Sequence, residues 1–353
     1  MTSVGSLRGF VCCVIAAAAA AAPPTPVVAR IAQGAPAYDL PLDALGATLD
    51  WWPNWGSSSL LSLDVAHPRL RSLARSLGAI TLRLGGSLDA IVQYWPNQSP
   101  AQCARPQVFR GATYSLCLNA SRWAELFSFA RDALAPGSHL VFGLQLDLGA
   151  GGAGPWRGEN ALAFLAAAAA SDPSAAVLSA FEVGEEVNPA PGSPGFAALL
   201  SAYAGVRAAI ARLWPSPRSR PLTLGPCVGM PYNIPPFSWT SAWVAAALGN
   251  GSAPPLVDAF VMHSYNNDGG ANWTRPGFLA QTGAQAAGLR DLLDAAGHAA
   301  TPLWCGECGP HNDNGLGGIT TSARSSFWFL DALLGLPIFC RNHFFLHLHD
   351  LLL

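Results

Sequence analysis

The feature that most constrains the fold of this chain is one pattern repeated along its length. Eight short runs are apolar almost throughout, without regular polar alternation, which is typical of parallel strands buried on both faces. Segments with apolar residues at helical spacing separate most of these runs, from 60–77 near the start to 322–334 near the end. The strand-like runs are 46–51, 79–87, 139–147, 179–186, 221–228, 257–265, 302–308 and 337–345.

A strand followed by a helix, repeated up to an eighth strand, predicts an α/β chain folded as a (β/α)8 TIM barrel that stops after strand eight. The competing doubly wound sheet is often marked by a G-x-G-x-x-G turn after its first strand, and no such turn occurs here. The length of 353 residues suits a single barrel. We expect the barrel over 30–345, after a signal peptide at 1–29 and before an atypical tail at 346–353.

The charge composition excludes one class of partner. Only 11% of the residues are charged, the formal net charge is −2, and all 19 basic residues are arginines spread thinly along the chain. Nucleic-acid-binding proteins carry clustered basic residues. We therefore expect no nucleic-acid partner. The same scarcity of basic clusters argues against a highly sulfated polymer.

The N-terminus has the pattern of a secretory signal peptide. Arg8 precedes the apolar run 10–22, Pro23 and Pro24 end that run, and a small-residue site follows at Ala29. The run is shorter than the roughly 20 residues that span a bilayer. We expect a secreted or endomembrane protein, including a vacuole- or lysosome-like location. Membrane association would then be peripheral or through an uncleaved signal segment.

An oxidising compartment permits disulfides and N-glycosylation. Cys103 and Cys117 close a short proline-containing loop and are the predicted disulfide pair. The predicted glycosylation sites, each in a sequon, are Asn119, Asn250 and Asn272.

The C-x-x-C pattern of Cys305 and Cys308 has three interpretations. It occurs in redox sites and forms half of many zinc sites. No second C-x-x-C or histidine pair stands at the spacing of a zinc finger. We favour two packed or disulfide-bonded cysteines, and we expect no metal and no cofactor.

Carboxylates follow two of the predicted strands. Glu185 and Glu186 come after the run that starts at residue 179, and Glu307 ends the run that starts at residue 302. In a (β/α)8 barrel the carboxyl ends of all strands meet at the face that carries the active site. Two carboxylates brought together there are the requirement for glycoside hydrolysis. Other polar residues predicted at this rim are Asp50, Ser87, His263 and Tyr265.

Several short segments, in this order and spacing, resemble the heparanase-like glycoside hydrolases of family 79, particularly plant and algal members. The matching segments are 47–53 (ATLDWWP), 82–87 (LRLGGS), 121–123 (SRW), 141–144 (VFGL), 182–186 (EVGEE), 263–265 (HSY), 306–309 (GECG) and 339–341 (FCR). The resemblance implies a retaining β-glucuronidase on a TIM barrel. It also implies a carbohydrate substrate, either a glucuronic-acid-containing glycan or a small glucuronide of plant or algal type.

The resemblance also implies roles for individual residues. Glu186 occupies the acid/base position, Glu307 the nucleophile position, and Tyr265 that of a tyrosine beside the nucleophile. The predicted substrate-binding positions are Asp50, Ser87, Glu185, His263, Gly317 and Gly318. The two glycines resemble those whose amides face the uronic carboxylate.

Two departures from the family pattern leave an alternative open. Relatives have asparagine where this chain has Glu185, and a carboxylate cannot donate a hydrogen bond as an amide does. Relatives also continue past the barrel into a β-sandwich, whereas this chain stops at Leu353. The alternative function is a secreted carbohydrate-binding or matrix protein on the same barrel, with impaired catalysis.

Overall fold

The computed structural model describes thirteen segments of the chain. They are 45–51, 60–95, 106–109, 111–146, 156–186, 188–229, 239–249, 254–266, 275–312, 315–320, 322, 325–339 and 344–347. The predicted signal peptide, Cys103, Asn250, Asn272 and most of the predicted tail lie outside these residues.

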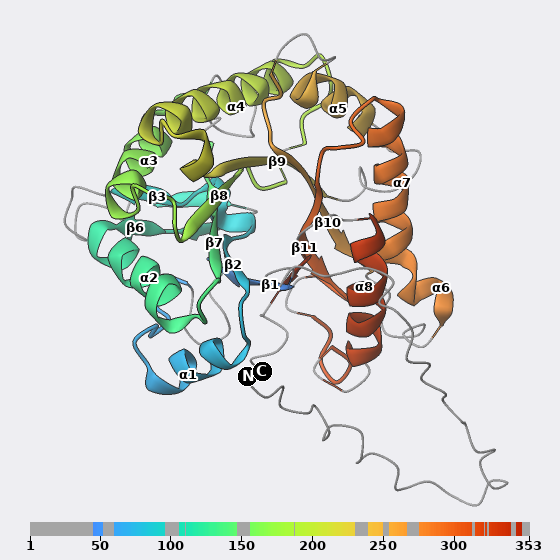
Figure 1. Cartoon of the computed structure of the whole chain (residues 1–353), viewed down its shortest axis with the longest axis horizontal. Coiled ribbons are helices and arrows are strands. Elements are labelled where there is room, and N and C mark those ends of the chain that lie inside the picture. Colours follow the sequence, from blue (N-terminus) through green and yellow to red (C-terminus); the bar gives the residue numbers. More distant parts are fainter. Residues whose placement is uncertain are drawn as a thin grey trace, which may run out of the picture. The chain divides into compact units, whose positions relative to one another are not determined.

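Eight parallel strands form a closed barrel, as predicted (Figure 1). Around the barrel the strand order is β1, β12, β11, β10, β9, β8, β7 and β2, and β2 pairs with β1 to close the ring. The strands are β1 (Leu45–Asp50), β2 (Thr81–Gly85), β7 (His139–Leu144), β8 (Leu178–Val183), β9 (Leu222–Val228), β10 (Ala259–Tyr265), β11 (Leu303–Gly309) and β12 (Phe344–His347).

The predicted eighth strand begins too early in the chain. Its residues 337–339 end helix α8 (Ser325–Phe339), whereas its residues 344–345 belong to strand β12 (Phe344–His347). An apolar run bounded by weak signals fits a buried helix as well as a buried strand, because periodicity alone does not separate the two. The other seven predicted runs each overlap a barrel strand.

Helices surround the barrel strands in Figure 1. Their bounds are α1 (Pro68–Ser76), α2 (Ala120–Ala133), α3 (Glu159–Ser171), α4 (Pro194–Leu213), α5 (Thr240–Leu248), α6 (Pro276–Leu279), α7 (Gln281–Ala295) and α8. Sequence analysis did not predict α5, which has no charged residue. An apolar helix without a polar face has no amphipathic stripe to reveal it.

The connection between β2 and α2 carries additional short elements. The 3₁₀ helix η1 (Ser87–Ala90) follows β2 directly, and a second one, η4 (Pro217–Ser219), precedes β9. Strand β3 (Gln93–Trp95) pairs in parallel with β6 (Cys117–Asn119). Between them, β4 (Gln107–Phe109) and β5 (Ala112–Tyr114) form an antiparallel pair.

Two apolar clusters stabilise the barrel. The smaller cluster joins residues of β7 to β11, namely Val141, Ala180, Leu224, Cys227, Ala259, Val261 and Trp304. The larger cluster packs the strands against the helices and includes the stacked rings of Phe142 and Phe164, whose centroids are 4.4 Å apart. Trp123 of α2 meets Phe142 edge-on. Aromatic contacts of this kind join β7 to two successive helices.

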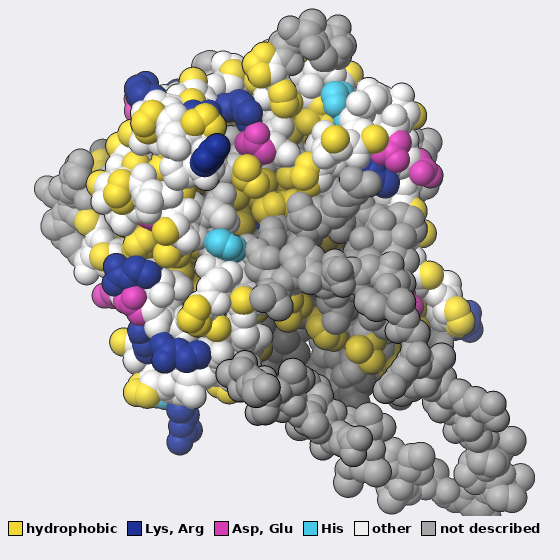
Figure 2. Space-filling view, viewed as in Figure 1, with side chains coloured by type: hydrophobic (Ala, Val, Ile, Leu, Met, Phe, Trp, Pro, Cys, Tyr) yellow, Lys and Arg dark blue, Asp and Glu magenta, His cyan; other side chains and the backbone are white. Residues whose placement is uncertain are grey.

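Helix α4 is, among the described residues, the one helix long and apolar enough to cross a membrane. It packs Leu199, Tyr203 and Val206 into the larger apolar cluster. Arginines on the face shown in Figure 2 lie over the helical rim, several of them beside acidic side chains.

Candidate active site

A buried arginine lies at the centre of the candidate site. Arg83 of β2 is fully buried and donates to three glutamates through three different nitrogens. Its Nη1 is 2.7 Å from Glu307 Oε1, its Nη2 is 2.6 Å from Glu185 Oε2, and its Nε contacts Glu182 Oε2. The planar guanidinium suits such multidentate binding. Arg83 therefore orients carboxylates from two different parts of the barrel.

His263 of β10 is the second link between these carboxylates. Its Nδ1 lies 3.2 Å from Glu186 Oε1, 3.5 Å from Glu185 Oε1 and 3.8 Å from Glu307 Oε2. Its Nε2 lies 3.3 Å from Glu182 Oε1. Burial acts to lower the pKa of His263, but the negative charges of Glu185 and Glu307 outweigh it, so this pKa is raised. The imidazole is therefore held in its charged form over a wider pH range than usual.

Glu307 has a hydrogen-bond donor at each carboxylate oxygen. Arg83 donates to Oε1, and the Tyr265 hydroxyl donates to Oε2 at 2.8 Å. Tyr265 therefore lies beside Glu307 and contacts it directly. Burial and the charge of Glu307 raise the pKa of Tyr265, so the phenol keeps its proton. Donors on both oxygens hold this carboxylate in one orientation.

Glu186 differs from Glu307 in exposure. Its side chain is 33% exposed, against 7% for Glu307. Its backbone φ of 44° lies in the left-handed region, which non-glycine residues rarely adopt. A Cβ on Gly229 would lie 2.6 Å from Glu186 Oε1, so the missing side chain of Gly229 provides room for this carboxylate. The left-handed backbone thus holds Glu186 in a position where its side chain contacts His263 and stays partly exposed.

Glu185 is buried, with 2% of its side chain exposed. Its Oε2 accepts from Arg83, while its Oε1 has no hydrogen-bond partner. Burial and the charge of Glu307 raise the pKa of Glu185. The pKa of Glu182 falls to about 2, because Arg83 and His263 outweigh the effect of burial. Arg83 and the charged His263 are shared among several carboxylates, and Glu185 binds a proton more readily than Glu182.

The end of β2 approaches the end of β1 very closely. A Cβ on Gly86, whose φ is 123°, would lie 2.3 Å from Asp50 Oδ2. Only glycine fits this position without strain. The next residue, Ser87, opens η1 and is half-buried, and Asp50 is half-buried as well. Both predicted sugar-contacting residues therefore lie at the strand ends.

Asp89 of η1 forms hydrogen bonds with residues that follow both of these strands. It is buried, accepts from Trp51 Nε1, and its Oδ2 accepts from the Gly86 amide at 3.3 Å. Burial raises the pKa of Asp89. A Cβ on Gly143 would lie 2.0 Å from Asp89 Oδ2, so β7 must carry glycine there.

Besides the cysteines, the remaining predicted residues within the described segments are Gly317, Gly318 and Asn119. Gly317 and Gly318 form an exposed turn after β11, with no heavy atom within 4 Å of an added Cβ. Asn119 is half-buried, and its Oδ1 accepts from the Arg122 amide at the start of α2. The roles predicted for these three residues stay predictions.

The structure shows the bonding of some of the cysteines discussed above. Cys305 and Cys308 form a disulfide on β11, on either side of Glu307, as the favoured interpretation expected. Two sulfurs bonded to each other cannot bind zinc as thiolates. Cys117 is disulfide-bonded, but Cys103 lies outside the described residues, so that pairing stays a prediction.

Four buried residues of this site were not predicted as functional from the sequence: Arg83, Glu182, Asp89 and Cys227. For Arg83 and Glu182 the sequence did contain a signal that could have revealed them. Arg83 and Glu182 are charged residues inside otherwise apolar strands of a chain with only 11% charged residues. A charge at such a position needs a buried partner. The partner itself lies 99 residues away and cannot be read from local sequence.

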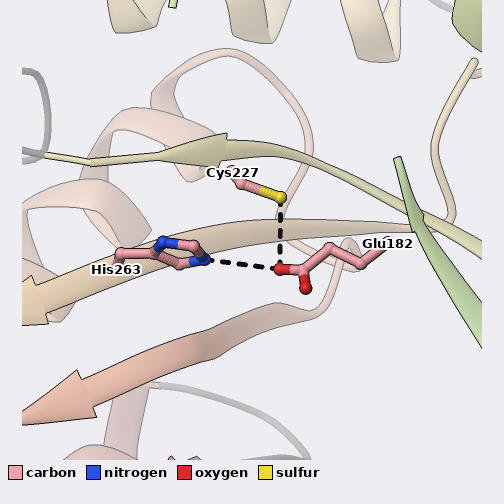
Figure 3. Close-up of side chains that lie close together, drawn as sticks. All are labelled: Glu182, Cys227 and His263. Atoms are coloured by element: carbon pink, nitrogen blue, oxygen red, sulfur yellow. Dashed lines mark hydrogen bonds and ion pairs between the residues drawn. The ribbon is translucent and has the colours of Figure 1, made fainter. Parts of the chain in front are cut away.

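Figure 3 shows how Cys227 joins the network. Glu182 of β8, Cys227 of β9 and His263 of β10 point toward one another from three neighbouring strands. Cys227 Sγ lies 3.1 Å from Glu182 Oε1, and His263 Nε2 lies 3.3 Å from the same oxygen.

Comparison with known proteins identifies the family. Residues 33–335 match the model of the glycosyl hydrolase family 79 N-terminal domain. The barrel and its carboxylates define a chain of the TIM-barrel glycosidase class. The chain belongs to glycoside hydrolase family 79.

Curated relatives agree with this assignment. The chain is 25% identical to heparanase-like protein 3 of Arabidopsis thaliana over 322 residues, which cover 82% of this chain and 56% of that protein. It is 26% identical to heparanase-like protein 1 of the same plant, covering 81% and 55%. The chain thus spans about half the length of these relatives. It also matches the baicalin-β-D-glucuronidase of Scutellaria baicalensis at 32% identity, over 28% of this chain and 20% of that protein.

Solved structures confirm the fold. A 4-O-α-L-rhamnosyl-β-D-glucuronidase from Fusarium oxysporum superposes with a TM-score of 0.57 at 18% identity, covering 87% of this chain and 63% of that one. A GH39 β-xylosidase from Caulobacter crescentus gives a TM-score of 0.51 at 15% identity, covering 86% and 62%. At these identities the likeness concerns the barrel alone.

Proposed function

We propose that this chain is the barrel of a retaining glycoside hydrolase that cleaves β-glucuronide linkages, with Glu307 as nucleophile and Glu186 as acid/base. The observation that carries the proposal is the position of the two carboxylates. Glu186 Oε1 and Glu307 Oε2 lie 3.2 and 3.8 Å from one atom, His263 Nδ1. These oxygens can be no farther apart than the sum of those distances. This favours the retaining separation of about 5–5.5 Å over most of the inverting range of about 6.5–9.5 Å.

The environment of Glu307 suits a nucleophile. Arg83 and Tyr265 donate to its two oxygens, which favours the ionised carboxylate and fixes its direction of attack. Attack on the anomeric carbon forms the bond to Glu307 and breaks the bond to the leaving oxygen. The Tyr265 hydrogen bond then weakens as the carboxylate charge moves onto the departing group.

The environment of Glu186 suits an acid/base. Its one-third exposed side chain lies beside His263 at the open side of the site. It gives a proton to the leaving oxygen in the first step and takes one from water in the second. Solvent access is needed for that second step.

Glu185 replaces the asparagine of relatives without bringing a third full negative charge. Its raised pKa favours the neutral carboxyl, whose carbonyl oxygen still accepts from Arg83. Its buried Oε1, which lies 3.5 Å from His263 Nδ1, would carry that proton and donate it to a sugar hydroxyl that approaches this oxygen. A protonated glutamate therefore supplies the donor that an amide would supply.

The glucuronide class rests on the family and on relatives. One relative is named for a β-D-glucuronidase, and others are named heparanase-like. The sparse arginines favour glycan side chains or small aryl glucuronides over a highly sulfated polymer. Secretion by way of the predicted signal peptide is part of the same proposal.

The test is hydrolysis of a chromogenic aryl β-glucuronide by the secreted chain. Glu307→Gln should abolish turnover, while Glu186→Ala should regain turnover with azide and release a β-glucuronyl azide. ¹H NMR should show that the first sugar product keeps the β configuration. An initial α product would contradict the retaining assignment, and full activity of Glu307→Gln would contradict the site.

A second candidate function is carbohydrate binding without turnover, which the extra buried carboxylate Glu185 favours. The parent would then bind a glucuronide in a calorimeter without releasing the aryl group. Turnover that appears only in Glu185→Asn would assign the defect to that carboxylate.

A further inference from the structure

We propose that Glu182, Cys227 and His263 form a binding site for one thiophilic divalent cation of the zinc type, and that its occupation inhibits the candidate active site. The three side chains come from adjacent strands and converge on one point (Figure 3). The described part of the chain offers no other use for the Cys227 thiol in the proposed reaction.

The donor set and its spacing fit zinc. A carboxylate oxygen, a thiol sulfur and an imidazole nitrogen lie within 4.8 Å of one another. The sulfur is 3.1 Å and the nitrogen 3.3 Å from the same oxygen. Ligands at about 2.0–2.3 Å from a tetrahedral zinc are separated by similar distances. The side chains need little rearrangement to enclose a cation.

The atoms of His263 and Glu182 that would not bind the cation form the hydrogen bonds that are typical of metal ligands. His263 binds through Nε2, which leaves its Nδ1–H to donate to Glu186 Oε1 at 3.2 Å. Carboxylate partners of this kind orient metal-bound histidines. Glu182 binds through Oε1 while Arg83 holds its Oε2. Two of the three ligands are therefore already oriented by a second residue.

Gly306 of β11 leaves room next to the donors. A Cβ at this position would lie 2.7 Å from Glu182 Oε1 and 3.1 Å from His263 Nε2. Any other residue would place a methyl or larger group against two of the ligands.

The local charge favours a cation as well. Four carboxylates, Glu182, Glu185, Glu186 and Glu307, lie within 4 Å of His263, while one arginine faces them. When the cation binds, the Cys227 thiol and the charged imidazole of His263 each release one proton to solvent. The two charges of the dication replace these two protons, so the net charge of the site is unchanged.

Occupation would inhibit the proposed reaction through the ring of His263. The cation would hold this ring in one orientation, and its Nδ1 lies 3.2 Å from Glu186 Oε1 and 3.8 Å from Glu307 Oε2. The ring could then not adjust as substrate binds between the two carboxylates. This consequence depends on the proposed function, whereas cation binding itself does not.

The direct test is titration of the purified full chain with Co²⁺ as a spectroscopic substitute for Zn²⁺. We expect one Co²⁺ per chain, with the near-ultraviolet absorption of a cobalt thiolate, displaced by Zn²⁺. X-ray absorption of the zinc form should show one sulfur at about 2.3 Å and nitrogen or oxygen ligands at about 2.0–2.1 Å. Spectra with no sulfur ligand would overturn the proposal. This measurement uses the parent protein alone.

Cys227→Ser is the matched variant, because it keeps the size of the side chain and leaves the Cys305–Cys308 disulfide in place. Loss of an outer-shell partner costs about 10- to 100-fold in metal affinity, so loss of this ligand should weaken Co²⁺ binding by at least about 100-fold. Cys227→Ala serves the same purpose if the serine variant fails to fold. Unchanged affinity in either folded variant would overturn the proposal.

The inhibitory consequence is tested by the ratio of aryl glucuronide turnover with and without Zn²⁺ in each protein. We expect Zn²⁺ to suppress turnover of the parent, reversibly with a chelator, and to have at least about tenfold less effect on Cys227→Ser. Equal inhibition of both would refute the regulatory part. If the parent shows no turnover even with a chelator present, the proposed function is refuted instead. The cobalt titration then still tests whether the cation site exists.

Discussion

At the scale of single residues, the site depends on how one arginine is shared. Arg83 contacts Glu182, Glu185 and Glu307, and its pKa is raised although burial opposes this, because the three negative charges outweigh the loss of hydration. Buried ion pairs of this kind are costly to break, since removal of one partner leaves charges without compensation.

Arg83→Met should therefore lower the free energy of unfolding by about 3–5 kcal/mol. Urea denaturation at neutral pH measures the change. The matched control is Arg207→Met, which breaks the partly exposed pair with Asp258 and should cost about 0–1 kcal/mol. Equal losses in the two variants would contradict the central role of Arg83.

Glu185→Gln should stabilise the protein increasingly as pH rises. The pKa of Glu185 is raised in the folded state, so its contribution to stability is present below the unfolded value of about 4.3 and is lost as pH rises toward the folded value. Glutamine does not titrate and escapes that loss, which is about 1.4 kcal/mol for each unit of pKa difference.

The measurement for Glu185→Gln is the melting temperature across a pH series beside the parent. The difference between the two proteins should grow with pH and then level off. Glu125→Gln is the control, because the Glu125 side chain is 55% exposed. A constant difference at all pH values would show that the pKa of Glu185 is the same in the folded and unfolded states, which would contradict the prediction.

At the scale of elements, glycines let strand ends approach one another. Gly86 joins β2 to η1 with a left-handed φ of 123°, against the carboxylate of Asp50. A side chain here would be strained in its backbone and would also collide with Asp50.

Gly86→Ala should consequently cost more than strain alone, which is of order 1–3 kcal/mol for an unfavourable backbone conformation. Gly78→Ala separates the two effects, because Gly78 has a φ of 80° but no heavy atom within 4 Å of an added Cβ. Chemical denaturation should rank Gly86→Ala as clearly the less stable variant. Turnover, where measured, should fall for Gly86→Ala alone.

Seven strands were predictable because apolar runs without alternation are distinctive when turns and helices separate them. The eighth was predicted too early, because the apolar residues 337–339 end α8 instead of starting β12. Helix α5 was missed for a related reason, as it lacks a polar face. Local pattern fails where apolar residues occupy the exposed face as well as the buried one, as Phe327 and Leu330 do on α8.

At the scale of the whole molecule, the ring closes through β12. Strand β12 pairs with β1 through Leu45 to Thr48 and with β11 at two further positions. A closed barrel has no free strand edge, so removal of one strand exposes two edges at once.

Truncation after residue 343 should abolish cooperative unfolding and expose apolar surface to a dye such as ANS. The control stops after His347 and keeps the entire strand. Thermal melting with dye binding distinguishes the two chains. Sharp, parent-like unfolding of the shorter chain would show that β12 is dispensable for barrel closure.

The sequence by itself determined the fold class, the strand ends that carry Glu185, Glu186 and Glu307, and the resemblance to family 79. These features are local or periodic, so each can be recognised from short stretches of neighbouring residues. Only the tertiary structure decided that Arg83 serves three carboxylates, that His263 lies between the two candidate catalytic glutamates, and that Cys227 meets Glu182. Contacts between residues 45 to 224 positions apart depend on strand order and register in the closed barrel, which no local pattern encodes.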